Sequence, residues 1–202
     1  MSELVIQPTT TAQWHALVSD AEQAAGYSLG EELESYLVFL LMRYTRKPHM
    51  LSRVMALDYL KSNEGSRAAR GQKLKEVGDH CLLFSGLFPK HAEKRMIKVS
   101  YFVKLGRSAY QQVFENLHNR DSLYAHLSND FVTLMDILQT MRDLQHDDNH
   151  TTHLSPIHAF DLWHDTGSQH AYKTIKAMSS DGNPTKPAFI DLPSDNSPSK
   201  RH

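Results

Sequence analysis

Apolar residues recur at helical spacing along almost the whole chain, and this periodicity constrains the fold more than any other feature. The most regular stripe follows Pro89, where small and apolar residues alternate steps of three and four. Its members are Ala92, Met96, Val99, Val103, Gly106, Tyr110, Val113 and Leu117. Such steps place side chains on one face of an α-helix. The stripe therefore predicts a long helix whose apolar face packs against neighbouring helices.

The same spacing predicts an all-α fold of about seven helices, joined by short connections and therefore antiparallel to their neighbours. The expected helices cover residues 11–26, 28–44, 48–57, 66–88, 92–117, 122–141 and 156–178, with Thr166-Gly167 as a candidate break in the last. We expect one bundle-like domain over residues 1–178. Residues 179–202 are rich in proline and polar residues, which predicts a disordered tail.

Composition excludes several functional classes. The 202 residues carry 22 basic and 23 acidic side chains, a balance that does not favour a general polyanion binder. The only cysteine, Cys81, rules out an internal disulfide framework and a thiolate zinc cage, and its place on an apolar stripe predicts a buried, inert thiol. No apolar run approaches the ~18–20 residues that a membrane span needs. The N-terminal residues lack signal-peptide character, so we expect a cytoplasmic protein.

The 13 histidines raise the question of a metal site, because six of them fall between residues 146 and 170. Imidazole and carboxylate groups are ligands for zinc and iron. Asp161 and His164 lie three residues apart, on one face of a helix, and His158 extends the same row. His164 also falls on the predicted apolar stripe, so we expect it to point inward. A divalent metal, iron or zinc, held by Asp161, His164 and His158 is one interpretation; a polar surface with one core histidine is the other.

A di-metal bundle also needs carboxylates from other helices. Glu115 falls on the predicted solvent face of its helix, and Asp136 falls off the apolar stripe of the next. The usual four-carboxylate pattern is therefore absent from the sequence.

Glycines interrupt the two central helices at Gly78, Gly86 and Gly106. A glycine inside a helix costs ~1 kcal/mol relative to alanine, so a compensating reason is needed. Close approach of two helices is one reason, and space left for a ligand is another. An inward ion pair between Asp79 and Arg107 would be buried, and it would serve either as a functional anchor or to fix the register of the fold. The candidate ligand-binding or partner-binding residues are Asp79, His80, Tyr101, Arg107 and Tyr110.

The two segments GDHCLLFSGLFP, at residues 78–89, and VSYFVKLGRSAY, at residues 99–110, belong to one block. This block resembles part of a family of uncharacterised bacterial helical proteins of about this length. The resemblance covers residues 65–118. It implies an all-helical bacterial cytoplasmic protein and carries no activity or catalytic residue with it.

Residues 65–118 hold ten basic and four acidic side chains, so the central helices are basic while the chain as a whole is not. Nucleic-acid binding by these helices is one hypothesis, although no recognition motif accompanies the charge. A metal-dependent helical enzyme of di-iron or haem-oxygenase-like type is another. The leading hypothesis is a non-enzymatic module that binds a protein partner or a second copy of itself, because the apolar stripes are long and no catalytic constellation is present.

Overall fold

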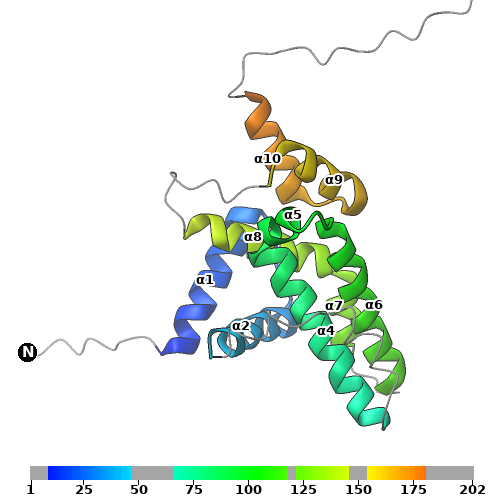
Figure 1. The fold of residues 1–202 in the computed structure, drawn as a ribbon. Helices are drawn as coiled ribbons and strands as arrows, with labels where there is room; N and C mark the ends of the chain where they lie inside the picture. Colours follow the sequence, from blue (N-terminus) through cyan, green and yellow to red (C-terminus); the bar gives the residue numbers. More distant parts are fainter. Residues whose placement is uncertain (1–8, 47–65, 118–121, 146–153, 181–202) are drawn as a thin grey trace, which may run out of the picture.

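The computed structural model describes residues 9–46, 66–117, 122–145 and 154–180, and these ranges form nine helices and no strand (Figure 1). The helices are α1 (Thr10–Ala25), α2 (Glu31–Arg46), α4 (Arg67–Leu87), α5 (Pro89–Lys94), α6 (Val99–Leu117), α7 (Leu123–Asn129), α8 (Phe131–Leu144), α9 (Pro156–Thr166) and α10 (Gln169–Ser180). The predicted all-α class is confirmed. The predicted helix at 48–57 lies outside the described residues. So does the predicted tail of residues 179–202 except for residues 179 and 180, which are not tail but the end of α10.

Local signals in the sequence explain where several helices begin and end. The Thr9 hydroxyl accepts a hydrogen bond from the Ala12 amide and caps α1. The Ser66 hydroxyl caps α4 in the same way. Gly26 and Gly167 adopt left-handed conformations, with φ of 80° and 75°, and end α1 and α9.

Two helices that the periodicity predicts as continuous are each divided in the structure. The stripe after Pro89 is split into α5 and α6 by a turn at residues 95–98, in which Met96 has φ of 57°. The segment 122–141 is split into α7 and α8 at Asp130. Apolar spacing continues across both breaks, which is why periodicity alone does not reveal them. The expected break at Gly167 is confirmed, and it separates α9 from α10.

The bundle is built around α4 and α6, which lie side by side and run in opposite directions (Figure 1). Helix α8 packs against both α1 and α4, and α7 packs on α6. Helices α9 and α10 form a hairpin at one end of the bundle, where α9 contacts α6 and α10 contacts α8. None of the described helices has the length and apolar character that crossing a membrane requires.

The glycines of the central helices mark points of close packing. A Cβ atom on Gly78 would lie 2.5 Å from the ring of Tyr110, and one on Gly106 would lie 2.5 Å from the ring of Phe131. A Cβ atom on Gly86 would lie 2.6 Å from the Leu138 side chain, so Gly86 faces α8 rather than α6. Because neighbouring side chains fill the space over each glycine, close approach is confirmed as the reason for these residues.

Candidate functional site

A buried carboxylate, Asp79 of α4, joins three helices in the middle of the bundle. The side chain is fully buried, and its Oδ1 accepts hydrogen bonds from the hydroxyls of Tyr36 (2.5 Å) and Tyr110 (2.8 Å). Its Oδ2 accepts from Nη2 of Arg43, which is an ion pair. Tyr36 and Arg43 lie seven residues apart on α2 and so present the same face to α4. One carboxylate therefore fixes α2 and α6 against α4.

The chemistry of this cluster favours a structural role over a catalytic one. Burial and the neighbouring Asp79 carboxylate raise the pKa of Tyr36 and of Tyr110 well above the ordinary value. Both phenols therefore stay protonated and donate to the carboxylate. Both oxygens of Asp79 already accept hydrogen bonds, and Arg43 pairs with the carboxylate. A buried, hydrogen-bonded network of this kind specifies how helices dock.

The five candidate binding residues from the sequence do not form one site. Tyr110 does meet Asp79, as the sequence suggested, and His80 is buried beside it. The predicted ion pair between Asp79 and Arg107 is wrong, because Arg107 lies at the surface and its Nε donates to the Ser128 carbonyl (3.0 Å). Tyr101 is half exposed and packs edge-on against Phe102, away from the carboxylate.

A second fully buried carboxylate, Asp136 of α8, holds the start of α10. It accepts hydrogen bonds from the backbone amides of Gln169 (2.8 Å) and His170 (3.2 Å), and from the hydroxyls of Ser168 (2.5 Å) and Tyr27 (3.1 Å). A carboxylate is stabilised at a helix N-terminus because the amides there have no partner within the helix. Burial and Asp136 raise the pKa of Tyr27 to about 12. The sequence placed Asp136 off the core, and that expectation is wrong.

A second contact between α8 and α10 joins the Asp143 carboxylate to Nε2 of His170, at 2.8 Å. Arg142 also pairs with Asp143, at 2.8 Å. Burial alone would raise the pKa of Asp143, but His170 and Arg142 outweigh it and lower that pKa to about 2. The carboxylate therefore stays ionised well below neutral pH, and α10 is anchored at two points along α8.

The structure separates the three residues of the predicted metal site. Asp161 pairs with Lys98 (3.1 Å), and His158 contacts Glu93 (3.3 Å) and the Ser155 hydroxyl (2.6 Å). His164 is exposed rather than inward, and its nearest carboxylate is Asp165 at 3.4 Å. Within the described ranges, no group of three or more histidine, cysteine, aspartate and glutamate side chains has a geometry that holds a metal ion.

The reason that His164 points outward is that α9 uses a different face to join the bundle. Ala159 and Leu162 are buried, whereas Ile157 and Phe160 are 69% and 48% exposed. Because α9 carries apolar residues on both faces, periodicity alone cannot choose the inward one. The stripe that was predicted to be core is therefore the solvent face of this helix.

Aromatic rings lie in contact on and beside this solvent face, and one of them, Trp163, is partly buried against the core. The rings of Phe160 and His164 are stacked, with centroids 6.1 Å apart, and Phe160 meets Trp163 edge-on at 5.7 Å. Trp163 in turn contacts Tyr172 of α10 at 5.6 Å, and Tyr172 is 44% exposed. We name Ile157, Phe160, Trp163, His164 and Tyr172 the α9 surface. It joins both helices of the hairpin.

Sequence reasoning missed Tyr36 and Arg43 as partners of Asp79, and Ser168 as a partner of Asp136. The spacing of seven between Tyr36 and Arg43 was a usable signal for a polar stripe on an otherwise apolar helix. Ser168 directly follows the helix-ending Gly167, a common place for the N-cap of a following helix.

Comparison of the chain with protein-family models, with curated proteins and with solved structures finds no match. The resemblance of residues 65–118 to bacterial helical proteins therefore stays a prediction.

Proposed function

We propose that this chain is a non-enzymatic helical module that binds another protein chain through the α9 surface. The observation that carries the proposal is the exposure of Ile157 and Phe160 on a helix whose other face already supplies its contacts with the bundle. Aromatic side chains are enriched in protein interfaces because they bury a large apolar area and lose little conformational freedom.

The buried polar groups support the same interpretation. The carboxylates of Asp79 and Asp136 are used to dock helices, and their hydrogen-bond partners come from within the bundle. The Cys81 thiol is fully buried, and burial raises its pKa, which makes the sulfur a poor nucleophile. These groups support a rigid platform, and the α9 surface is the part of that platform with chemistry suited to a partner.

The platform also fixes the orientation of the α9 surface. The α9–α10 hairpin is attached to α8 by Asp136 and by the contact of Asp143 with His170. It is attached to the turn before α6 by the pair of Asp161 with Lys98. A partner that contacts Phe160 therefore meets side chains that are already positioned, which lowers the entropic cost of binding.

Site-specific photocrosslinking tests this proposal. A photoreactive phenylalanine analogue replaces Phe160 in the full chain expressed in its own cells, and Phe39 of α2, which is 63% exposed, is the matched control position. We expect a discrete protein adduct at position 160 and none at position 39. The mass of the adduct shows whether the partner is a second copy of this chain. Adducts at position 39 but not at position 160 would overturn the assignment of the α9 surface.

A further inference from the structure

The turn between α5 and α6 places a methionine where the backbone favours glycine. The amide of Ile97 donates to the Ala92 carbonyl (3.0 Å), and the amide of Met96 donates to the Glu93 carbonyl (2.9 Å). This pair of hydrogen bonds is the Schellman motif that ends many helices, with its left-handed position usually taken by glycine. Met96 occupies that position with φ of 57°. A residue with a Cβ atom is strained there.

The Met96 side chain gains nothing within the described bundle that offsets this strain, because it is 93% exposed. An exposed apolar side chain on a strained backbone is unfavourable in two respects, and strain of this kind clusters at functional positions. Ile97 follows Met96 in the same turn, Tyr101 lies in the first turn of α6, and their side chains are 37% and 45% exposed. We call the exposed side chains of Met96, Ile97 and Tyr101 the apolar tip.

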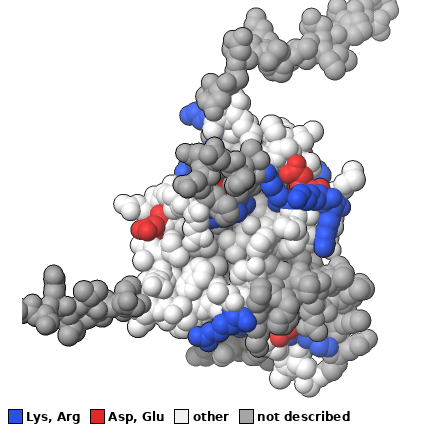
Figure 2. Space-filling model, turned by 60° about the vertical axis from the view of Figure 1, so that its left-hand side comes forward, with Lys and Arg blue, Asp and Glu red and all other residues white. Residues whose placement is uncertain are grey.

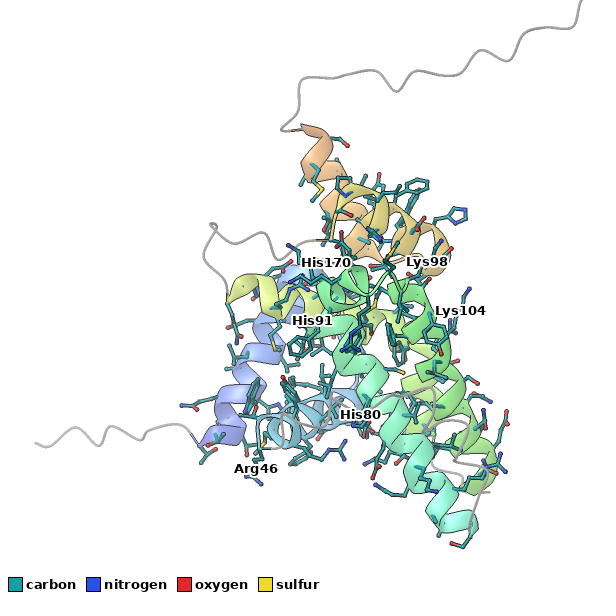
Figure 3. All side chains as sticks on the ribbon, in the orientation of Figure 1. Arg46, His80, His91, Lys98, Lys104 and His170 are labelled. Atoms are coloured by element: carbon teal, nitrogen blue, oxygen red, sulfur yellow. The ribbon has the colours of Figure 1, made fainter. Side chains whose placement is uncertain are left out.

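Exposed cations lie in the same turn and in the helices on either side of it, and Asp161 and Asp165 lie close to two of them. Lys94, Arg95, Lys98 and Lys104 are all exposed. Lys98 pairs with Asp161, whereas Lys94 and Arg95 make no ion pair within the described part of the chain. Figure 3 shows Lys98 and Lys104 on the same side of the molecule, and Figure 2 shows that Lys and Arg side chains on the visible face gather in patches. We name residues 94–98 with Tyr101 and Lys104 the Met96 turn.

The shape of the Met96 turn decides which kind of anionic partner it fits. The seam between the turn and α9 encloses only about 10 Å³, which is too small for a peptide side chain or a nucleotide base. An exposed apolar tip flanked by cations instead suits a soft anionic surface, into which Met96 and Ile97 insert while Lys94 and Arg95 meet lipid phosphates. Tyr101, with an apolar ring and a polar hydroxyl, suits the same interface.

We propose that the Met96 turn is a weak, reversible docking site for a bilayer that carries anionic lipids. The site is separate from the α9 surface, so it does not depend on the function proposed above. The binding uses no covalent step and no membrane-spanning helix.

Sedimentation of the full chain with lipid vesicles at low salt tests the proposal. We expect binding to vesicles of phosphatidylcholine with phosphatidylglycerol and none to vesicles of phosphatidylcholine alone. Met96→Gly is the informative variant because glycine relieves the backbone strain, so the fold is kept while the tip is lost. We expect it to bind about tenfold more weakly. Arg95→Gln is expected to bind about fivefold more weakly.

Arg46→Gln is the matched control. Arg46 is exposed at the end of α2, far from Lys98 in Figure 3, and its loss is expected to leave vesicle binding unchanged. The proposal is overturned if the chain does not bind anionic vesicles, if Met96→Gly binds as well as the original chain, or if Arg46→Gln weakens binding as much as Arg95→Gln. Binding to duplex DNA that depends on Arg95, with vesicle binding absent, would assign the cations to a nucleic acid instead.

Discussion

The hydroxyl of Tyr110 donates a 2.8 Å hydrogen bond to the Asp79 carboxylate beside Gly78, where α4 has no side chain to hold α6 away. The glycine and the hydrogen bond are two parts of one arrangement. The missing Cβ lets the Tyr110 ring lie against the α4 backbone, and from that position the phenol reaches the adjacent residue. Tyr36 meets the edge of the same ring, at 6.4 Å between centroids, and donates to the same oxygen.

The first prediction concerns the Asp79 carboxylate. Asp79→Ala leaves two buried phenols and the Arg43 guanidinium without their acceptor, so we expect the free energy of unfolding to fall by about 3 kcal/mol. Tyr110→Phe removes one hydrogen bond to a charged group and is expected to cost about 2 kcal/mol. Urea unfolding measures both. Asp20→Ala, at an exposed position on α1, is the control and should change the free energy by less than ~0.5 kcal/mol.

The second prediction concerns Gly78. Alanine is the better helix former by ~1 kcal/mol, yet its Cβ would lie 2.5 Å from the Tyr110 ring. We expect Gly78→Ala to lower the free energy of unfolding by about 2 kcal/mol, because the ring must move and its hydroxyl leaves Asp79. In a Tyr110→Leu background the same change should cost much less. Equal costs in the two backgrounds would show that the glycine does not serve the Tyr110 contact.

The third prediction concerns acid stability. His170 and Arg142 lower the pKa of Asp143 to about 2, below its value of ~3.9 in an unfolded chain. The stabilisation is therefore complete above pH ~4 and is lost as the pH falls towards 2. We expect Asp143→Asn to remove about 1–2 kcal/mol at neutral pH, after allowing for solvent screening, and almost nothing near pH 2. Parallel acid-unfolding curves for the two proteins would contradict the pairing.

The fourth prediction concerns backbone strain. Met96→Gly should raise the free energy of unfolding by about 1 kcal/mol, or about 2–4 °C in melting temperature, because glycine tolerates the left-handed conformation. Gly167→Ala makes the opposite change at φ of 75°, where nothing lies within 4 Å of the added Cβ, and should destabilise by about the same amount. Calorimetry measures whether the melting temperature rises for Met96→Gly and falls for Gly167→Ala. A melting temperature lowered by Met96→Gly would show that the Met96 side chain has a structural role in the bundle.

Helical periodicity shows which face of each helix is apolar, and much of the architecture can therefore be predicted from the sequence. The all-α class and the packing of the central pair follow from it. Periodicity cannot detect a turn that leaves the apolar spacing unchanged. The break at Met96 is such a turn, so the sequence predicts one continuous helix there. Periodicity also fails for α9, where apolar residues lie on two faces and the positions of α6 and α10 decide that Leu162, not Phe160, is buried.

The polar partners are harder to predict because they depend on distances between helices. Asp79 and Tyr110 are recognisable as neighbours of glycines in the central pair. The choice of Arg43 over Arg107 as the cation is set by where α2 crosses α4, which the sequence does not encode locally. Asp136 is buried because the start of α10 lies over it, a contact between residues more than thirty positions apart.

The central claim is that this chain binds a protein partner through the α9 surface. Its most direct test is the affinity of the crosslinked partner for three purified forms of the full chain. Titration calorimetry compares the original chain with Phe160→Ala and with Phe39→Ala. We expect Phe160→Ala to weaken binding at least about tenfold, as the loss of a central aromatic contact does, and Phe39→Ala to leave it unchanged. Unchanged affinity for Phe160→Ala, or an equal loss for Phe39→Ala, would contradict the claim.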